Sequence, residues 1–169
     1  VTNCFSTVAA TTTGEYAAGL IGYNYGAVSL CYASGDLQSS KVAAGVVGYN
    51  DGASATINNC VAVNNVIAVT DAGGYGMRVL GGYKDGAPDP TTNNYALKTM
   101  SISVNGVTQK IYDDLLNGAA KTIDVLQTNT PYTELGWDFT NVWKFNAETL
   151  TPELRNTEGE APADVPVSA

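Results

Sequence analysis

The sequence predicts an all-β fold, a parallel β-solenoid closed by a C-terminal cap, and two repeated patterns carry this prediction. The phrase Ala-Ala-Gly-Leu-Ile-Gly-Tyr-Asn at 17–24 returns as Ala-Ala-Gly-Val-Val-Gly-Tyr-Asn at 43–50, and more loosely as Met-Arg-Val-Leu-Gly-Gly-Tyr-Lys at 77–84. Cys4, Cys31 and Cys60 recur in step with this phrase, at intervals of 27 and 29 residues. Self-similarity at a nearly fixed period indicates a stack of short structural units.

Composition favours strands in these units. Residues 1–70 are rich in Gly, Val, Thr and Tyr and contain only four charged side chains, a pattern typical of strands rather than of helical repeats. A single coil cannot cover its own apolar face, whereas coils stacked about 4.8 Å apart share a buried column. We expect Gly22, Gly48 and Gly82 to allow close approach of backbones in this stack.

Four coils are expected within residues 1–96, the fourth beginning at Asn94, which takes the place of the cysteines. The third coil is longer, and its insertion at 70–76 is the expected variable binding loop. Arg78 stands in the column of Ala18 and Ala44 and suggests that this column faces outward, although the apolar Leu20, Val46 and Leu80 share its parity. Whether Leu20 or Ile21 points inward is left open, because neighbouring residues of a strand face opposite sides.

The sequence of residues 97–155 predicts a hairpin and a cap that pack on the solenoid. Alternating runs flank Asn105 and Gly106, a two-residue turn signal, and short helical segments are expected at 112–118 and 130–134. We expect Trp137, Phe139 and Trp143 to close the exposed end of the last coil, with a carbohydrate-stacking site as the alternative. Residues 156–169 predict a flexible linker.

The repeats resemble a known family. Gly-Leu-Ile-Gly-Tyr-Asn at 19–24, followed by Cys-Tyr-Ala-Ser-Gly at 31–35, is similar to the GLUG repeat of bacterial surface proteins. That repeat occurs in adhesins of gut Bacteroidetes and beside the protease domain of immunoglobulin A1 proteases. The resemblance covers residues 1–96, extends to a closing segment at 135–143 and implies a right-handed parallel β-helix. The third coil departs from the motif at Val79 and Gly81.

Charge and length exclude some classes of function. The net charge of −8 comes without a basic stripe for nucleic acid or anionic membrane, and no apolar run approaches about 18 residues, the length of a membrane span. The chain begins inside a repeat without a signal sequence, so we expect it to be a portion of a longer protein with neighbouring domains.

The three cysteines are expected to be buried free thiols. Residues in register on adjacent coils lie about 4.8 Å apart, farther than the separation that a disulfide prefers. The sequence has no histidine, which removes the commonest zinc ligand, so neither a metal nor a cofactor is expected.

The missing histidine also bears on catalysis, because nucleophiles paired with histidine cannot form within this chain. We therefore predict that the chain is not an enzyme. The alternative is a carbohydrate-active β-helix enzyme, using Asp for calcium and Arg78 or Lys84 as base. Its candidate carboxylates are more simply turn residues: Asp51, Asp71, Asp85 and Asp89.

Stacked tyrosines favour a binding surface instead. The expected contacts are Tyr23, Tyr49, Tyr83, Tyr75 and Arg78. The function predicted is a non-catalytic, extracellular or cell-surface adhesin-type module that presents its repeats to a protein or glycan of a host or bacterial surface. A purely structural spacer remains open, since a tyrosine ladder also stabilises neighbouring coils.

Overall fold

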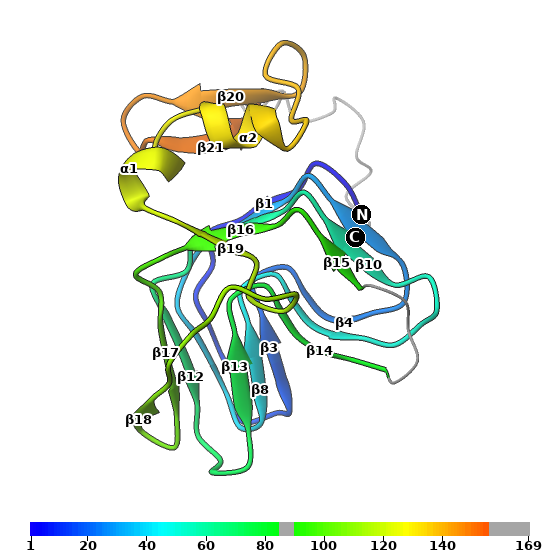
Figure 1. Ribbon diagram of the computed structural model, residues 1–169, viewed down its shortest axis with the longest axis vertical. Helices are drawn as coiled ribbons and strands as arrows, with labels where there is room; N and C mark the ends of the chain where they lie inside the picture. The colour runs from blue at the N-terminus through cyan, green and yellow to red at the C-terminus, as the bar shows by residue number, and fades with distance from the viewer. Residues whose placement is uncertain (85–89, 156–169) are drawn as a thin grey trace, which may run out of the picture.

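The chain forms an all-β stack of coils with a small aromatic unit against one side (Figure 1). The computed structural model describes residues 1–84 and 90–155. Within these ranges, successive coils contribute neighbouring parallel strands to five sheets. This arrangement is consistent with the predicted β-solenoid.

Each coil passes through the sheets in the same order. The first coil holds β1 (Phe5–Ser6), β2 (Ala10–Thr11), β3 (Tyr16–Ala18), β4 (Ile21–Asn24) and β5 (Ala27–Ser29). The second holds β6 (Tyr32–Ala33), β7 (Leu37–Ser39), β8 (Val42–Ala44), β9 (Val47–Asn50) and β10 (Thr56–Asn58). The third holds β11 (Val61–Ala62), β12 (Val66–Val69), β13 (Tyr75–Met77), β14 (Leu80–Tyr83) and β15 (Thr91–Thr92).

The fourth coil is incomplete and changes the pattern. It adds β16 (Tyr95–Leu97) to β11 and β17 (Ser101–Val104) to β12, both in parallel. The chain then turns back as β18 (Val107–Thr108), antiparallel to β17, and returns to pair β19 (Ala119–Lys121) with β16. Parallel pairing thus continues beyond residue 96.

The cysteines form one column, because β1, β6 and β11 pair in register. Cys31 and Cys60 are fully buried and Cys4 partly so, and all three thiols are free. The Cys31 and Cys60 thiols donate to the carbonyls of Ser29 and Asn58, at 3.0 and 3.4 Å. A hydrogen bond with Cys31, together with burial, raises the pKa of Cys60. The column packs as small apolar side chains.

A left-handed residue precedes each member of that column, a feature that the sequence analysis missed. The φ angles of Asn3, Leu30, Asn59 and Asn93 are 52°, 53°, 56° and 52°. Asparagine tolerates this conformation better than other residues with a side chain, so its recurrence one position before the cysteines was the available signal. Leu30 is the exception in the column.

The orientation of Leu20 and Ile21 follows from a break in the strand. β3 ends at Ala18 and β4 begins at Ile21, so the alternation of faces restarts between them. Both residues consequently pack against the core, and their counterparts in the second coil, Val46 and Val47, are fully buried.

The third coil is shifted by one residue from the register that the sequence analysis assumed. Leu80 pairs with Val47, Gly82 with Tyr49 and Tyr83 with Asn50. The predicted tyrosine column therefore holds only Tyr23 and Tyr49. The prediction that Tyr83 stands in register with them is wrong. A slip of one residue moves a side chain to the other face of its strand, and Tyr83 is partly buried against the core.

The same shift corrects the glycine column, which contains Gly81 in place of Gly82. A Cβ at Gly81 would lie 2.4 Å from the Gly48 carbonyl oxygen, and one at Gly48 would lie 2.5 Å from the Gly22 carbonyl oxygen. A Cβ at Gly22 would meet no atom within 4 Å. Gly48 and Gly81, the second residues of β9 and β14, therefore allow each strand to lie close to the strand before it.

Gly48→Ala should therefore lower the free energy of unfolding by about 1–3 kcal/mol, because the new methyl group overlaps a backbone atom that cannot move independently. Gly22→Ala, the matched control in the same column, should stay within about 0.5 kcal/mol of the parent. Urea denaturation followed by circular dichroism measures both. Equal losses in the two variants would contradict the close stacking at this corner.

The segment after β17 only partly follows prediction. The hairpin turn at Asn105 and Gly106 is confirmed, with φ of 47° and 74°, and α2 (Thr130–Glu134) is the expected helical turn. The prediction of a helix at 112–118 is wrong. Its place is taken by a loop in which the Asp114 carboxylate accepts hydrogen bonds from the backbone of Leu116 and Asn117. The helix α1 (Ile123–Leu126) was not predicted.

The aromatic unit comprises residues 122–155 and ends in the hairpin of β20 (Trp143–Asn146) and β21 (Thr151–Leu154). Its rings pack together: Tyr132 lies 5.1 Å from Trp137 and 6.2 Å from Phe139, and Trp137 lies 4.4 Å from Trp143. Burial raises the pKa of the Tyr132 hydroxyl, which donates to the Leu126 carbonyl at 2.8 Å.

The unit covers a side of the stack rather than its end, which corrects the predicted role of Trp137, Phe139 and Trp143. In Figure 1 it lies over the sheet that contains β1, β16 and β19. The Trp143 indole donates to the Asn3 side chain at 3.2 Å and the Trp137 indole to the Asn59 carbonyl at 2.9 Å. One aromatic unit thus spans the first and third coils.

Three predictions concern residues outside the described ranges: the linker at 156–169 and the turn positions of Asp85 and Asp89. The boundaries proposed between repeats, cap and linker stay a prediction. Among the described residues, no helix is both long and apolar enough to cross a membrane.

Candidate functional site

The strongest candidate site is a group of four tyrosines on the first two coils, called here the tyrosine cluster: Tyr16, Tyr23, Tyr25 and Tyr49. The rings of Tyr23 and Tyr49 stack with centroids 5.3 Å apart and an interplanar angle of 24°. The Tyr16 ring lies 5.6 Å from Tyr23 and 5.9 Å from Tyr49, and the Tyr25 ring lies 5.4 Å from Tyr23. Tyr23 therefore touches all three other rings.

Sheet geometry produces this convergence. Tyr23 and Tyr49 are register partners on β4 and β9, so their side chains share one face a strand spacing apart. Tyr16 comes from β3, on the other side of the bend at 19–20. The sequence analysis expected the stacked pair but did not place Tyr16 or Tyr25 with it, because the angle between two sheets cannot be read from repeat spacing.

Part of the cluster is open to solvent. Tyr25 is 68% exposed and Tyr23 41% exposed, whereas Tyr16 and Tyr49 are partly buried. Tyr75 is 40% exposed and aligns with Tyr16 through Val42. Its hydroxyl and the Tyr49 ring both approach Gly82. Tyr75 therefore borders the cluster, and Gly82 leaves the third-coil position beside Tyr49 without a side chain.

A charged group borders the rings. The Tyr23 hydroxyl donates to the Asp51 carboxylate at 2.9 Å, and the Lys84 ammonium lies 3.4 Å from the other carboxylate oxygen. The hydrogen bond from Tyr23 lowers the pKa of Asp51, with Lys84 contributing in the same direction. The same bond raises the pKa of Tyr23. Asp51 is therefore ionised at neutral pH and fixes the Tyr23 ring.

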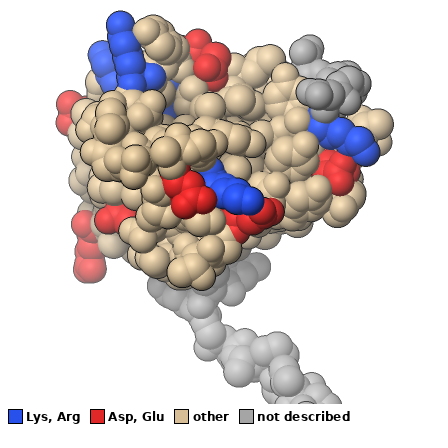
Figure 2. Space-filling view, turned by 90° about the horizontal axis from the view of Figure 1, so that it is seen from below, with Lys and Arg blue, Asp and Glu red and all other residues tan. Residues whose placement is uncertain are grey.

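This combination of groups suits a neutral, hydroxyl-rich ligand or a protein surface. Aromatic faces provide apolar contact, while the hydroxyls and the Asp51 carboxylate provide hydrogen bonds at their edge. Charged side chains on the face seen from below form small groups of both signs, separated by uncharged surface (Figure 2). No large patch of one charge sign is visible on the face in this view.

Arg78 does not belong to this surface, and its predicted outward orientation is wrong. It aligns with Gly45 rather than with Ala44, and only 2% of it is exposed. Its guanidinium donates to the carbonyls of Asn117 and Gly118 at 3.0 and 2.9 Å, and pairs with Asp113 at 2.6 Å. Backbone of residues 116–118 lies over this corner, and the Arg78 side chain is held against it by these hydrogen bonds.

Among the described carboxylates, Arg78 pairs with one rather than with a group. Its ionic partner is Asp113, whose pKa it lowers through their hydrogen bond. Asp51 is held instead by Tyr23 and Lys84. Within residues 1–84 and 90–155, no group of three or more Cys, Asp or Glu side chains is arranged to hold a metal ion.

Comparisons with known proteins give one structural likeness. No protein-family model matches the chain, so the GLUG resemblance is not confirmed, and no curated protein matches it either. A solved crystal structure described as a "putative immunoglobulin A1 protease from Bacteroides ovatus" is similar, with a TM-score of 0.71 and 24% identity. The match covers 91% of this chain and 47% of the other, so this chain spans about half the length of that protein.

The likeness supports the all-β architecture, found in a protein of the Bacteroidetes. It also corrects the prediction that the chain is not an enzyme, because the solved protein with this fold bears the name of a protease. At this level of identity the two chains share a fold, and the assignment of a function depends on the site described above.

Proposed function

We propose that this chain is a right-handed β-helical module of a secreted or cell-surface bacterial protein, and that its tyrosine cluster binds a glycan or protein of a host or bacterial surface. The observation that carries the proposal is the convergence of four tyrosine rings on Tyr23, with Tyr25 and Tyr23 open to solvent. Exposed aromatic side chains that lie together are typical of interaction sites.

The GLUG resemblance and the adhesin-type role belong to the same proposal. Both rest on the repeated sequence pattern, and the architecture shared with a Bacteroides protein supports a bacterial protein of the Bacteroidetes type. The dispersed charge and the absence of a basic stripe support a partner other than nucleic acid. Neighbouring domains of a longer protein would then place the cluster on the cell surface.

A glycan and extracellular-matrix array tests the cluster. Tyr23→Ala/Tyr25→Ala should reduce binding about tenfold or more, because these two rings supply the exposed contact area. Both side chains are accessible, so the variant should keep the parent circular dichroism spectrum. Val8→Ala removes an apolar side chain that is 67% exposed elsewhere and serves as the control. The array is run with and without calcium.

Binding that survives the double substitution would place the contact surface elsewhere on the module. No binding by the parent protein would favour the structural spacer. Loss of binding in the Val8→Ala control as well would point to nonspecific adsorption on exposed apolar surface.

A second candidate is that the module contributes to a proteolytic protein by holding its substrate. The name of the structurally similar Bacteroides protein favours this candidate. Immunoglobulin A1 is therefore included among the array ligands and incubated with the module, and the products are measured by mass spectrometry. Binding without cleavage would support a substrate-holding role, and cleavage would place catalytic groups within this chain.

A further inference from the structure

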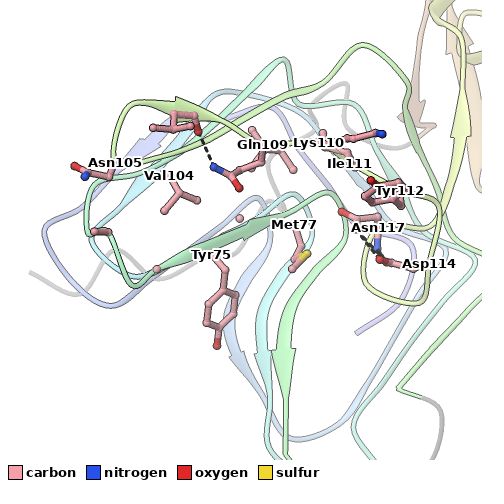
Figure 3. Close-up of a pocket in the computed structure, with 15 residues that line it drawn as sticks. Tyr75, Met77, Val104, Asn105, Gln109, Lys110, Ile111, Tyr112, Asp114 and Asn117 are labelled. Atoms are coloured by element: carbon pink, nitrogen blue, oxygen red, sulfur yellow. Dashed lines mark hydrogen bonds between the residues drawn. The ribbon is translucent and has the colours of Figure 1, made fainter.

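A cavity lies beside β13 at the end of the stack, away from the tyrosine cluster. It has a volume of about 540 Å³ and is lined by β13 on one side and by residues of the returning segment 102–117 on the other. In Figure 3 Val104 and Met77 lie on either side of the view, with the Gln109 side chain between them. The expected binding loop at 70–76 borders this cavity through Gly74, Tyr75 and Gly76.

The cavity exists because two neighbouring sheets end at different heights. β17 forms a fourth layer on β12, whereas the sheet of β3, β8 and β13 ends at its third strand within the described chain. Beside β17, the position of a fourth strand on β13 is therefore empty in the described chain; this position is called here the step. Backbone from 116–117 covers the corner beyond this strand, where Val79 donates to Leu116 and Arg78 to Asn117. Gly76 is buried, yet within the described chain no strand pairs with this edge of β13.

Hydrogen-bond direction makes this edge a template for a further strand. Tyr75 donates to the Lys41 carbonyl, and the Met77 carbonyl accepts from Gly45, so both residues bond back to the second coil. In a parallel ladder the residue between them directs its N–H and C=O to the opposite side. Gly76 therefore presents one donor and one acceptor toward the cavity, at the spacing that an extended peptide matches.

Side chains around the step suit a peptide with a carboxylate. Apolar contact comes from Met77 and Val104, and a pocket of this size accommodates a few residues. Lys110 is the base on the lining, and it forms no ion pair with any described residue. The acid on the lining, Asp114, is already bonded to the backbone of Leu116 and Asn117. In Figure 3 Lys110 lies toward the Met77 end of β13.

We propose that this step binds an extended peptide, which adds a fourth strand to β13 through Gly76 and directs a carboxylate, from an acidic side chain or its own C-terminus, toward Lys110. The peptide runs parallel to β13, as every other strand of this sheet does. This site is independent of the tyrosine cluster and of the function proposed for it.

The test is affinity selection from a synthetic library of hexapeptides with free C-terminal carboxylates, followed by isothermal titration of the enriched peptide. Gln109→Trp should fill the cavity and weaken binding about tenfold or more. Gln38→Trp places the same ring on an exposed strand position of the second coil and should leave binding unchanged. Lys110→Glu should weaken binding through charge reversal.

Two further measurements distinguish strand addition from general adhesion. Methylation of the peptide nitrogen that pairs with Gly76 should weaken binding about tenfold, since it removes a backbone hydrogen bond and adds a clash. The Gly76 amide should shift in the ¹H–¹⁵N spectrum on titration. Tyr23→Ala/Tyr25→Ala should bind the peptide as the parent does, so failure of this site and failure of the tyrosine cluster are separable.

The proposal would be overturned by a library that yields no saturable binder. It would also be overturned by a binder that is insensitive to both Gln109→Trp and backbone methylation, or by one whose binding shifts amides of the tyrosine cluster instead of Gly76.

Discussion

Trp143→Ala should lower the free energy of unfolding by about 3–5 kcal/mol, the usual cost of removing a fully buried tryptophan. None of the Trp143 surface is exposed, and its ring packs 4.4 Å from that of Trp137. The substitution also leaves the Asn3 side chain without its indole partner. Urea denaturation measures the loss, with the unfolding slope as a check that the transition remains two-state.

Trp143→Phe is the matched control, because it keeps an aromatic ring and removes mainly the indole hydrogen bond. Its loss should be clearly smaller. Hydrogen exchange gives the decisive detail: the alanine variant should exchange faster in the first coil, near Asn3, as well as within the aromatic unit. Faster exchange confined to the fourth coil would show that the unit closes the end of the stack after all.

Arg78→Ala should cost about 3 kcal/mol or more. The guanidinium donates to two backbone carbonyls and to Asp113, and hydrogen bonds from charged groups contribute about 1.5–3 kcal/mol each to stability. Removal leaves those carbonyls without donors at the end of the stack. Thermal and urea unfolding both report the change.

Lys41→Ala provides the contrast, because it removes another ion pair, with Glu15, whose side chains are more than half exposed. Its cost should stay below about 1 kcal/mol. In Arg78→Ala, the pKa of Asp113 should rise toward the ordinary aspartate value, as measured by NMR titration. A small loss of stability with an unchanged Asp113 pKa would contradict the arrangement described for this corner.

The parts of the fold that could be predicted are those set by exact repetition. The column of Cys4, Cys31, Cys60 and Asn94 appears in the structure as expected, because each member opens a strand of the same sheet. The third copy of the glycine phrase misled the analysis. Its tandem Gly81 and Gly82 admit two registers, and only the stacking contact of Gly81 with Gly48 selects between them.

The candidate sites divide in the same way. The stacking of Tyr23 on Tyr49 follows from identical positions in consecutive repeats, so the sequence predicts it. The addition of Tyr16 depends on the angle between two sheets. The burial of Arg78 depends on where the stack stops, and the cavity beside Gly76 depends on β17 rising one layer higher than its neighbour. No local pattern encodes these features.

The aromatic unit has a consequence for how the stack comes apart. Stability in a repeat protein is ordinarily a chain of nearest-neighbour terms, so that terminal repeats open first and independently. Here the hydrogen bond from Trp143 to Asn3 joins residues 140 positions apart. The neighbouring Trp137 indole donates to the Asn59 carbonyl at the start of the third coil. Unfolding of the first coil therefore requires that the aromatic unit dissociate from it. We expect the first coil and the aromatic unit to unfold together, in a single transition.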